Sequence, residues 1–257
     1  MTNKEYREHE GLSRSELFRI AKSPLHFRYA LDHPEEKTPA LTFGSAAHKY
    51  ILEMDEFDAE YAVAPIVDRR TKDGKLEYAE FLKNVGEKEV ITLEDLGKIK
   101  EMRKAIERDP NASRFLYGDS ARYEQSFFWT DEQTGEAVKC RPDCLIEVNG
   151  RKYIVDYKTT SSCEDGHFER ACRKYGYKLQ AGMYREGVFQ NTLDDYGFAF
   201  VAQEKEAPYA VRVYVCSEEF ICEGYDQYRE LIGLYHYCKE HDKWYGYDMA
   251  DLIGEGE

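Results

Sequence analysis

The sequence predicts a mixed α/β (α+β) fold, in which helices pack around a central mixed sheet. The N-terminal part shows helix caps and helical periodicity, the middle is rich in β-branched and aromatic residues, and the last third alternates between the two patterns. With 257 residues, the chain has the length of one substantial domain. We therefore expect a single domain over residues 1–257, with an N-terminal helical part (about 12–110) and a core (about 120–245).

Helix signals dominate the N-terminal part. Ser13 and Glu16 form a capping box, which predicts a helix to about Ala30 that is interrupted at Pro24. Thr92, followed by an acidic residue three positions later, predicts the start of a long helix that ends near residue 108. Between these two we expect helices over about 43–54 and 75–85, an extended stretch and basic loop over 58–75, and a short strand at 90–91.

Strand signals begin near residue 120. Turn residues separate the segments, and the expected order is three strands, two helices, two strands and one helix. The expected ranges are 122–130, 136–148 and 152–159 for the first strands, 163–175 and 177–189 for the helices, 196–202 and 209–215 for the last strands, and 217–241 for the final helix.

Composition indicates a globular protein of the cytoplasm. Hydrophobic residues make up 42% of the chain and charged residues 33%. No apolar run approaches the ~18–20 residues that span a membrane, and the polar start lacks a signal-peptide core, so no membrane partner is expected. The seven cysteines are odd in number and form no CxxC pair. This favours reduced, mostly buried thiols over a four-cysteine iron–sulfur cluster.

The net charge of −14 is unusual for a DNA-binding protein, because phosphate contacts normally dominate affinity. The acidic residues are unevenly distributed: residues 203–257 hold 13 acidic and 5 basic side chains. Basic groups cluster instead at residues 69–75 and 170–178. Metal sites also require carboxylates. The overall charge therefore neither supports nor excludes a function on DNA.

The segment from Arg141 to Thr160 predicts a hairpin that assembles a charged site. Asn149-Gly150 is a favoured type I′ turn pair, and a two-residue loop would pair Val148 with Arg151. In that register Asp143 lies opposite Asp156, with Cβ atoms ~4.5–5.5 Å apart. Strand alternation places Lys158 on the same face.

Two carboxylates at this spacing repel each other unless a cation lies between them. Hard oxygen ligands favour Mg²⁺, with Mn²⁺ as an alternative. The competing interpretation is a surface hairpin with a cross-strand Asp–Lys pair and a spare aspartate. The apolar Ile154 and Val155 argue against it, because they indicate a strand that is buried.

Several motifs in this chain resemble the PD-(D/E)xK nuclease superfamily. Pro142-Asp143 followed by Asp156-Tyr157-Lys158 matches its signature. Gly44 to His48 resembles the G-x-x-x-H segment of RecB-type nuclease domains, and Gln180 to Tyr184 resembles their Q-x-x-x-Y motif. The three motifs occur in the order found in that superfamily, whose fold is a restriction-endonuclease-like central mixed sheet flanked by helices.

From about Leu12 to Trp244 the chain looks similar to the nuclease domain of exonuclease VIII (RecE) and to related phage-borne PDDEXK-like exonucleases. This resemblance implies a Mg²⁺-dependent 5′→3′ exonuclease that acts on linear double-stranded DNA in phage-type recombination. It also implies a homo-oligomer, in the form of a tetrameric ring, and a single-strand annealing protein as partner. In such a ring the basic clusters at residues 69–75 and 170–178 would face the channel, and the acidic surfaces of residues 203–257 would lie outside. The segment beyond Trp244 resembles nothing identified.

The resemblance also assigns residue roles. The expected metal ligands are His48, Asp143, Asp156 and the Tyr157 carbonyl. Lys158 would assist the attacking water, and the other expected catalytic residues are Glu124, Gln180 and Tyr184. Expected contacts to DNA are Arg69, Arg70, Lys72, Thr159 and Tyr177.

Two alternatives remain open. One is a single-strand nuclease or endonuclease of the same fold, such as a Cas4-like protein, although the cysteine spacing of a cluster is missing. The other is a DNA-binding module without turnover. The presence of Asp143, Asp156 and Lys158 together argues against it, because loss of catalysis usually removes one of those residues.

Overall fold

The centre of the computed structural model, which describes residues 1–34 and 37–247, is a five-stranded sheet of order β3-β6-β7-β8-β9. Strands β7 and β8 run parallel, and the other neighbours are antiparallel. The predicted mixed sheet is therefore confirmed. Its strands are β3 (Arg122–Tyr123), β6 (Cys144–Val148), β7 (Arg151–Thr160), β8 (Gly197–Glu204) and β9 (Val211–Val215).

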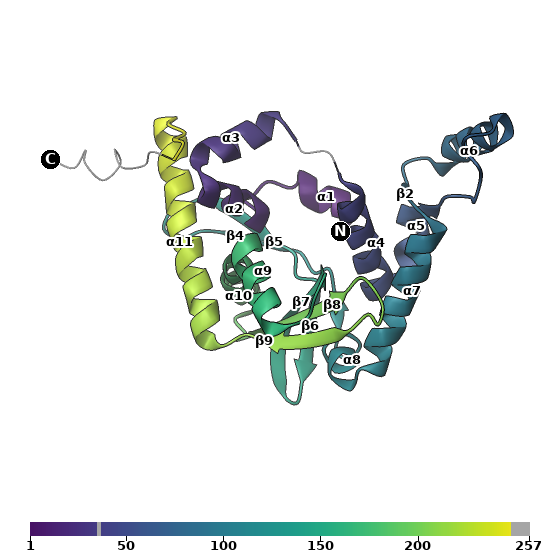
Figure 1. Ribbon diagram of the computed structural model, residues 1–257. Helices are drawn as coiled ribbons and strands as arrows, with labels where there is room; N and C mark the ends of the chain where they lie inside the picture. Colours follow the sequence, from purple (N-terminus) through teal and green to yellow (C-terminus); the bar gives the residue numbers. More distant parts are fainter. Residues whose placement is uncertain (35–36, 248–257) are drawn as a thin grey trace.

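Helices cover both faces of this sheet (Figure 1). On one face Val155 and Tyr157 of β7 pack among α4 (Pro39–Leu52), α7 (Leu93–Arg108) and α8 (Pro110–Leu116). On the other, Ile154 packs under α9 (Asp165–Tyr175) and α10 (Tyr177–Thr192). A third cluster joins α10 to α2 (Arg14–Lys22) and α11 (Glu218–His241). The N-terminal helices thus share hydrophobic clusters with the strands and helices of the core region.

The predicted interruption at Pro24 is a junction between two helices. Ser23 ends α2 by donating its N–H to the Arg19 carbonyl, and its hydroxyl caps α3 (Pro24–Asp32). Proline is favoured at the first helical position because its missing N–H would have no partner there. The capping boxes at Ser13 and Thr92 are both present. Helix α4 begins earlier than expected, since Thr38 caps it.

Two strands were predicted too long. The 122–130 segment divides into β3 and β4 (Phe127–Thr130), and the 136–148 segment into β5 (Ala137–Cys140) and β6. Strands β4 and β5 form a separate two-stranded sheet. The break has a local cause: Glu124, expected within a strand, adopts a left-handed φ of 51°, which ends the β3 ladder.

A helical arm projects from the body of the protein (Figure 1). Helix α6 (Lys72–Val85) buries only Gly74, and the two strands at its base, β1 (Tyr61–Val63) and β2 (Glu89–Ile91), pair in parallel. The basic loop was expected to extend to residue 75, but α6 already starts at Lys72. Before β1 lie a short 3₁₀ helix, η1 (Met54–Glu56), and α5 (Phe57–Glu60).

A short N-terminal helix, α1 (Asn3–Glu8), was not predicted. It buries none of its own residues. The ammonium of Lys139, itself buried, holds its end through the carbonyls of Tyr6 and Arg7 at 3.2 Å and that of His9. Within residues 1–34 and 37–247, no helix has both the length and the apolar character that crossing a membrane requires.

Candidate active site

The β6–β7 hairpin has the predicted register. Asn149 and Gly150 both have positive φ, at 53° and 77°, as a type I′ turn requires. Val148 pairs with Arg151, and the ladder ends at Cys144 opposite Val155. The next residue, Asp143, therefore lies beside β7, where its Oδ2 accepts a 2.7 Å hydrogen bond from the Tyr157 N–H. The turn and the strand alternation alone bring this carboxylate to β7.

Asp156 and Lys158 lie together on β7, as alternation predicts. The Lys158 ammonium forms an ion pair with Asp156 Oδ2, which accepts no well-aligned hydrogen bond. Gln180 of α10 donates its side-chain amide to the other oxygen, Oδ1. Asp156 is only 1% exposed, so these two partners are important for holding its charge.

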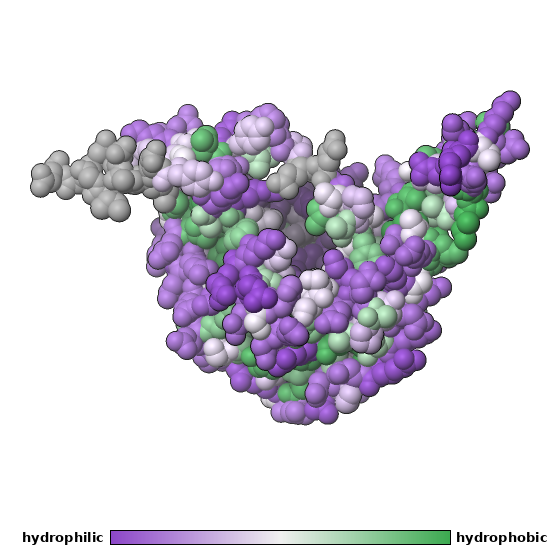
Figure 2. All heavy atoms as spheres, in the orientation of Figure 1, coloured by the Kyte–Doolittle hydropathy of each residue, from purple (hydrophilic) through white to green (hydrophobic). Residues whose placement is uncertain are grey.

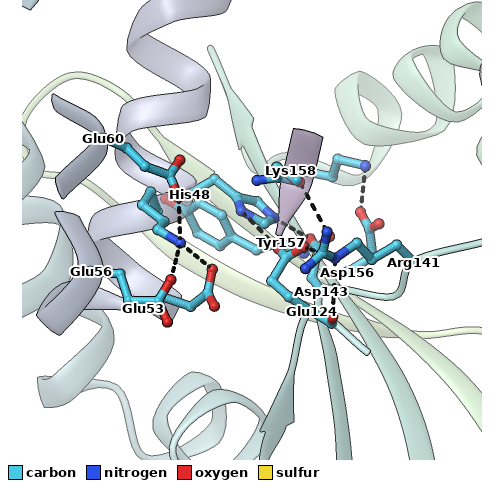
Figure 3. A network of polar contacts seen from close by, with 12 residues as sticks. His48, Glu53, Glu56, Glu60, Glu124, Arg141, Asp143, Asp156, Tyr157 and Lys158 are labelled. Atoms are coloured by element: carbon cyan, nitrogen blue, oxygen red, sulfur yellow. Dashed lines mark hydrogen bonds and ion pairs between the residues drawn. The ribbon is translucent and has the colours of Figure 1, made fainter. Parts of the chain in front are cut away.

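His48 reaches the hairpin from α4. Its Nε2 lies 2.8 Å from Asp143 Oδ2, and its Nδ1 lies 3.5 Å from Glu124 Oε1 (Figure 3). One ligand atom from each of these three residues falls within 4.8 Å of the others. Among the described residues, this is the one group of His, Cys, Asp and Glu side chains with the spacing of a metal site. Asp156 lies next to the group but outside it.

Arg141 holds Glu124 in place. Its Nε donates a hydrogen bond to the Glu124 carbonyl and forms an ion pair with Glu124 Oε2, each at 3.0 Å. The N–H of Glu124 in turn donates to the Asp143 carbonyl at 3.1 Å. These bonds support the left-handed backbone at Glu124, which is costly for a non-glycine residue. Arg141 was not among the residues predicted for the site, although its position two residues before Asp143 was a usable signal.

The shifted pKa values reflect burial and crowding of charge. Burial opposes the imidazolium of His48, but Asp143 outweighs it and raises the pKa of His48 to about 9. Burial raises the pKa of Glu124 to about 7, against the opposing charge of His48. Burial and then Asp143 raise the pKa of Asp156 to about 6. For Asp143 burial acts in the same direction, but His48 and Lys158 keep its pKa below the usual range. Strongly shifted groups gathered in one place are typical of functional sites.

These residues border a cleft of about 1360 Å³, more than a typical small-molecule pocket needs. Figure 2 shows the hollow, surrounded mainly by hydrophilic residues. The expected site residues that line it are His48, Glu124, Asp143, Tyr157, Lys158, Thr159, Tyr177 and Tyr184. Asp156 and Gln180 lie buried beside it. Arg69, Arg70 and Lys72, expected to contact DNA, do not line it.

The remaining expected residues have mainly aromatic or packing contacts. The Tyr177 ring lies 5.1 Å from the Lys158 ammonium, a cation–π contact that restrains the lysine. Burial raises the pKa of Tyr184 well above its usual range, so its hydroxyl stays protonated. A Cβ at Gly44, which lies in α4, would meet Thr159 Oγ1 at an ordinary 3.7 Å. Space alone therefore does not require glycine at this position.

The buried ammonium of Lys49, the residue after His48, is surrounded by the carboxylates of three glutamates. The Lys49 ammonium lies 2.8 Å from Glu53, 2.7 Å from Glu56 and 2.8 Å from Glu60 (Figure 3). The lysine side chain is 8% exposed, whereas that of Glu56 is 65% exposed. This cluster fixes the end of α4, and so the helix that carries His48. This cluster was not predicted from the sequence, because residues 55–57 were assigned to no element and an extended stretch was expected from residue 58, which lies within α5.

All seven cysteines are free thiols, and five of them are buried. This agrees with the expectation of reduced, mostly buried thiols.

Comparison with known proteins supports this fold. Across the full chain, the protein superimposes on the crystal structure of the "Putative exonuclease" from Eubacterium rectale, with a TM-score of 0.67, 18% identity and 93% of that chain covered. The structure of SSO0001 is 16% identical over 84% of each chain, but its TM-score of 0.32 is too low to carry an argument. No curated protein matches the sequence. Residues 13–253 match the family described as PDDEXK-like domain of unknown function (DUF3799). The expected PD-(D/E)xK resemblance is confirmed, and the chain belongs to this family of PDDEXK-like domains.

Proposed function

We propose that this protein is a divalent-metal-dependent deoxyribonuclease that hydrolyses phosphodiester bonds. The observation that carries the proposal is the convergence of His48, Glu124 and Asp143 beside the Asp156–Lys158 ion pair. The group combines ligand atoms, a buried carboxylate and an ammonium at the edge of an open cleft. Metal-assisted hydrolysis of a phosphate ester needs these components, and the family supports a nuclease.

The donor set fits a divalent cation. One imidazole nitrogen and two carboxylates offer mostly hard ligands, which favour Mg²⁺ or Mn²⁺. Asp156 Oδ2, which lacks a hydrogen bond, offers a further oxygen next to them. Burial, and then the neighbouring Asp143 carboxylate, raise the pKa values of Glu124 and Asp156, and a bound cation would favour the charged form of both. Bound here, the cation would lower the pKa of water and offset negative charge on the transferring phosphate.

The chain's own residues have distinct roles in this proposal. His48, Asp143, Asp156 and the Tyr157 carbonyl bind the cation, with Glu124 as a further carboxylate. Lys158 donates a hydrogen bond to the attacking water or to the charge that develops on the phosphate, and its cation–π contact with Tyr177 limits its motion. Gln180 and Arg141 orient the buried carboxylates of Asp156 and Glu124, respectively.

The finer assignment is a 5′→3′ exonuclease on linear double-stranded DNA, working in the cytoplasm as a homo-oligomeric ring with a single-strand annealing partner. Support for this comes from the sequence resemblance to exonuclease VIII and from the description of the Eubacterium rectale structure as an exonuclease. Arg69, Arg70 and Lys72 would contact DNA only where it extends beyond the cleft of one protomer.

Digestion of a linear duplex labelled at either 5′ or 3′ ends tests both levels of the proposal. We expect Mg²⁺-dependent release of label, first from the 5′ ends, and no cleavage of closed circular DNA. Release from 3′ ends, or cutting of circles, would reject the polarity or the exonuclease mode. If the protein binds DNA but hydrolyses it with neither Mg²⁺ nor Mn²⁺, the nuclease is rejected and the alternative of a DNA-binding module without turnover is supported.

A further inference from the structure

A buried glutamine connects the candidate active site to α7. Strand alternation places Gln203 of β8 on the same face as Val201, which packs in the hydrophobic cluster beneath α4 and α7. The Gln203 residue is 0% exposed. Its Oε1 accepts a 2.6 Å hydrogen bond from the Tyr157 hydroxyl, and its Nε2 donates to the carbonyls of Met102 at 2.7 Å and Tyr209 at 3.4 Å. Both polar atoms of the side chain therefore have partners inside the protein.

The chemistry of these groups fixes the direction of each hydrogen bond. A backbone carbonyl can only accept, so the amide nitrogen of Gln203 faces Met102 on α7 and the amide oxygen faces Tyr157. The Tyr157 hydroxyl is then the donor, and it has to point at one oxygen atom. An apolar contact at the same place would not impose such a direction on the ring.

Tyr157 transmits this restraint to the site. Its ring lies beside that of His48, with the ring centroids 6.2 Å apart (Figure 3). Its N–H donates to Asp143 Oδ2 at 2.7 Å, and its carbonyl is the one expected to bind the cation. The backbone of this residue also joins Asp156 to Lys158. A ring that is held at its far end therefore limits how far this part of β7 can shift relative to α4 and α7.

The buried polar groups need a physical reason, because the surrounding cluster is apolar. Methionine at position 203 and phenylalanine at position 157 would fill similar space without the desolvation cost of an amide and a hydroxyl. A buried polar network whose members all have partners adds rigidity and one defined arrangement. We infer that Gln203 is a positioning residue of the candidate active site, which anchors the Tyr157 ring to the Met102 carbonyl and so holds the backbone that meets Asp143 and the cation. This inference rests on the proposed function and deepens it.

Three variants separate positioning from stability. Tyr157→Phe leaves Gln203 Oε1 without its donor, and Gln203→Met leaves the Tyr157 hydroxyl without its acceptor. Each single substitution leaves a buried polar group unpaired, so each should lower the midpoint of urea unfolding. The double variant removes the hydroxyl and the amide together, and its midpoint should return toward that of the wild type.

Calorimetry with Mn²⁺ alone gives the deciding measurement. Both single variants and the double variant should bind Mn²⁺ about tenfold more weakly than the wild type, as is typical when a group that orients a metal ligand is lost. The matched control is Tyr214→Phe, which removes a 2.6 Å hydrogen bond from a tyrosine hydroxyl to the Cys163 carbonyl on the face covered by α9 and α10. This control should keep the wild-type affinity.

A merely structural role for Gln203 predicts a different outcome. The double variant would then regain both its stability and its Mn²⁺ affinity, and that result would overturn the inference. An equal loss of affinity in Tyr214→Phe would overturn it as well. If the double variant does not fold, Tyr157→Phe and Tyr214→Phe are compared directly, and equal Mn²⁺ affinities would reject the positioning role.

Failure of the proposed function gives its own pattern. A wild-type protein whose Mn²⁺ affinity depends on Gln203, but which never hydrolyses DNA with Mg²⁺ or Mn²⁺, keeps the inference and rejects the nuclease. Mg²⁺-dependent hydrolysis, together with equal Mn²⁺ affinity in the wild type and the double variant, keeps the nuclease and rejects the positioning role. A wild type that binds no divalent ion rejects both.

Discussion

Metal binding to the site of His48, Glu124 and Asp143 should release protons. A group must lose its proton to act as a ligand. At pH 7, His48 with a pKa of about 9 holds roughly one proton and Glu124 with a pKa of about 7 roughly half of one. Binding of Mn²⁺ should therefore release roughly 1.5 protons at pH 7 and about one at pH 8, where only His48 remains protonated. The association constant for Mn²⁺ should therefore rise by roughly 1.5 powers of ten per pH unit near pH 7 and by about one near pH 8.

Calorimetry in buffers of different ionisation enthalpy counts these protons directly. We expect His48→Gln to weaken Mn²⁺ binding at least tenfold, as loss of a ligand should. His241→Gln serves as the matched control, because His241 is exposed at the end of α11. Affinity that does not change between pH 6.5 and 8.5, with no proton release, would show that the imidazole and the carboxylates do not bind the ion, and would refute the reasoning.

Three further predictions concern catalysis and stability. Asp156→Ala should abolish Mg²⁺-dependent hydrolysis while circular dichroism shows a folded protein; near wild-type turnover would remove this residue from the site. Lys158→Ala should lose turnover but keep Mn²⁺ binding, since an ammonium is not a ligand; calorimetry that shows no binding would contradict its role. Without metal, the free energy of unfolding should fall as pH rises from about 4 to 9. The slope should be about 1.4 kcal/mol per pH unit for each proton that is bound in the native state and already lost in the unfolded state. The sign follows from three groups whose folded pKa lies above the unfolded value, and differential scanning calorimetry with and without Mg²⁺ should show that the ion reduces this fall.

A fourth expectation concerns the contact between α10 and α11. A Cβ at Gly182 would lie 2.1 Å from the backbone nitrogen of Tyr225, which real structures do not allow. Gly182→Ala should therefore cost about 3 kcal/mol or more, because neither helix backbone can yield cheaply. Gly233→Ala on α11 is the control, since a Cβ there meets nothing within 4 Å. Equal midpoints of urea unfolding for the two variants would show that the helices are not packed this closely.

Residues that are close together in the sequence determined the hairpin of the site and the starts of two helices. Asn149-Gly150 fixed the hairpin register, and with it the approach of Asp143 to β7 and the shared face of Asp156 and Lys158, because a strand period of two leaves no freedom once the turn is set. The caps at Ser13 and Thr92 marked helix starts for the same reason, since they satisfy backbone groups within a few residues. These features depend on neighbours in sequence, and the sequence alone predicts them.

Only the tertiary structure decided the features that depend on contacts between residues far apart in the sequence. The chain's 14 percent aromatic and 33 percent charged residues say nothing of which cation meets which carboxylate. Glu124 was expected in a strand, yet its left-handed backbone depends on Arg141 and the Asp143 carbonyl. The cluster around Lys49 and the placement of residues 69–72 outside the cleft likewise follow from how α4 and α6 are positioned. Distant partners are set by packing, which the order of residues along the chain does not display.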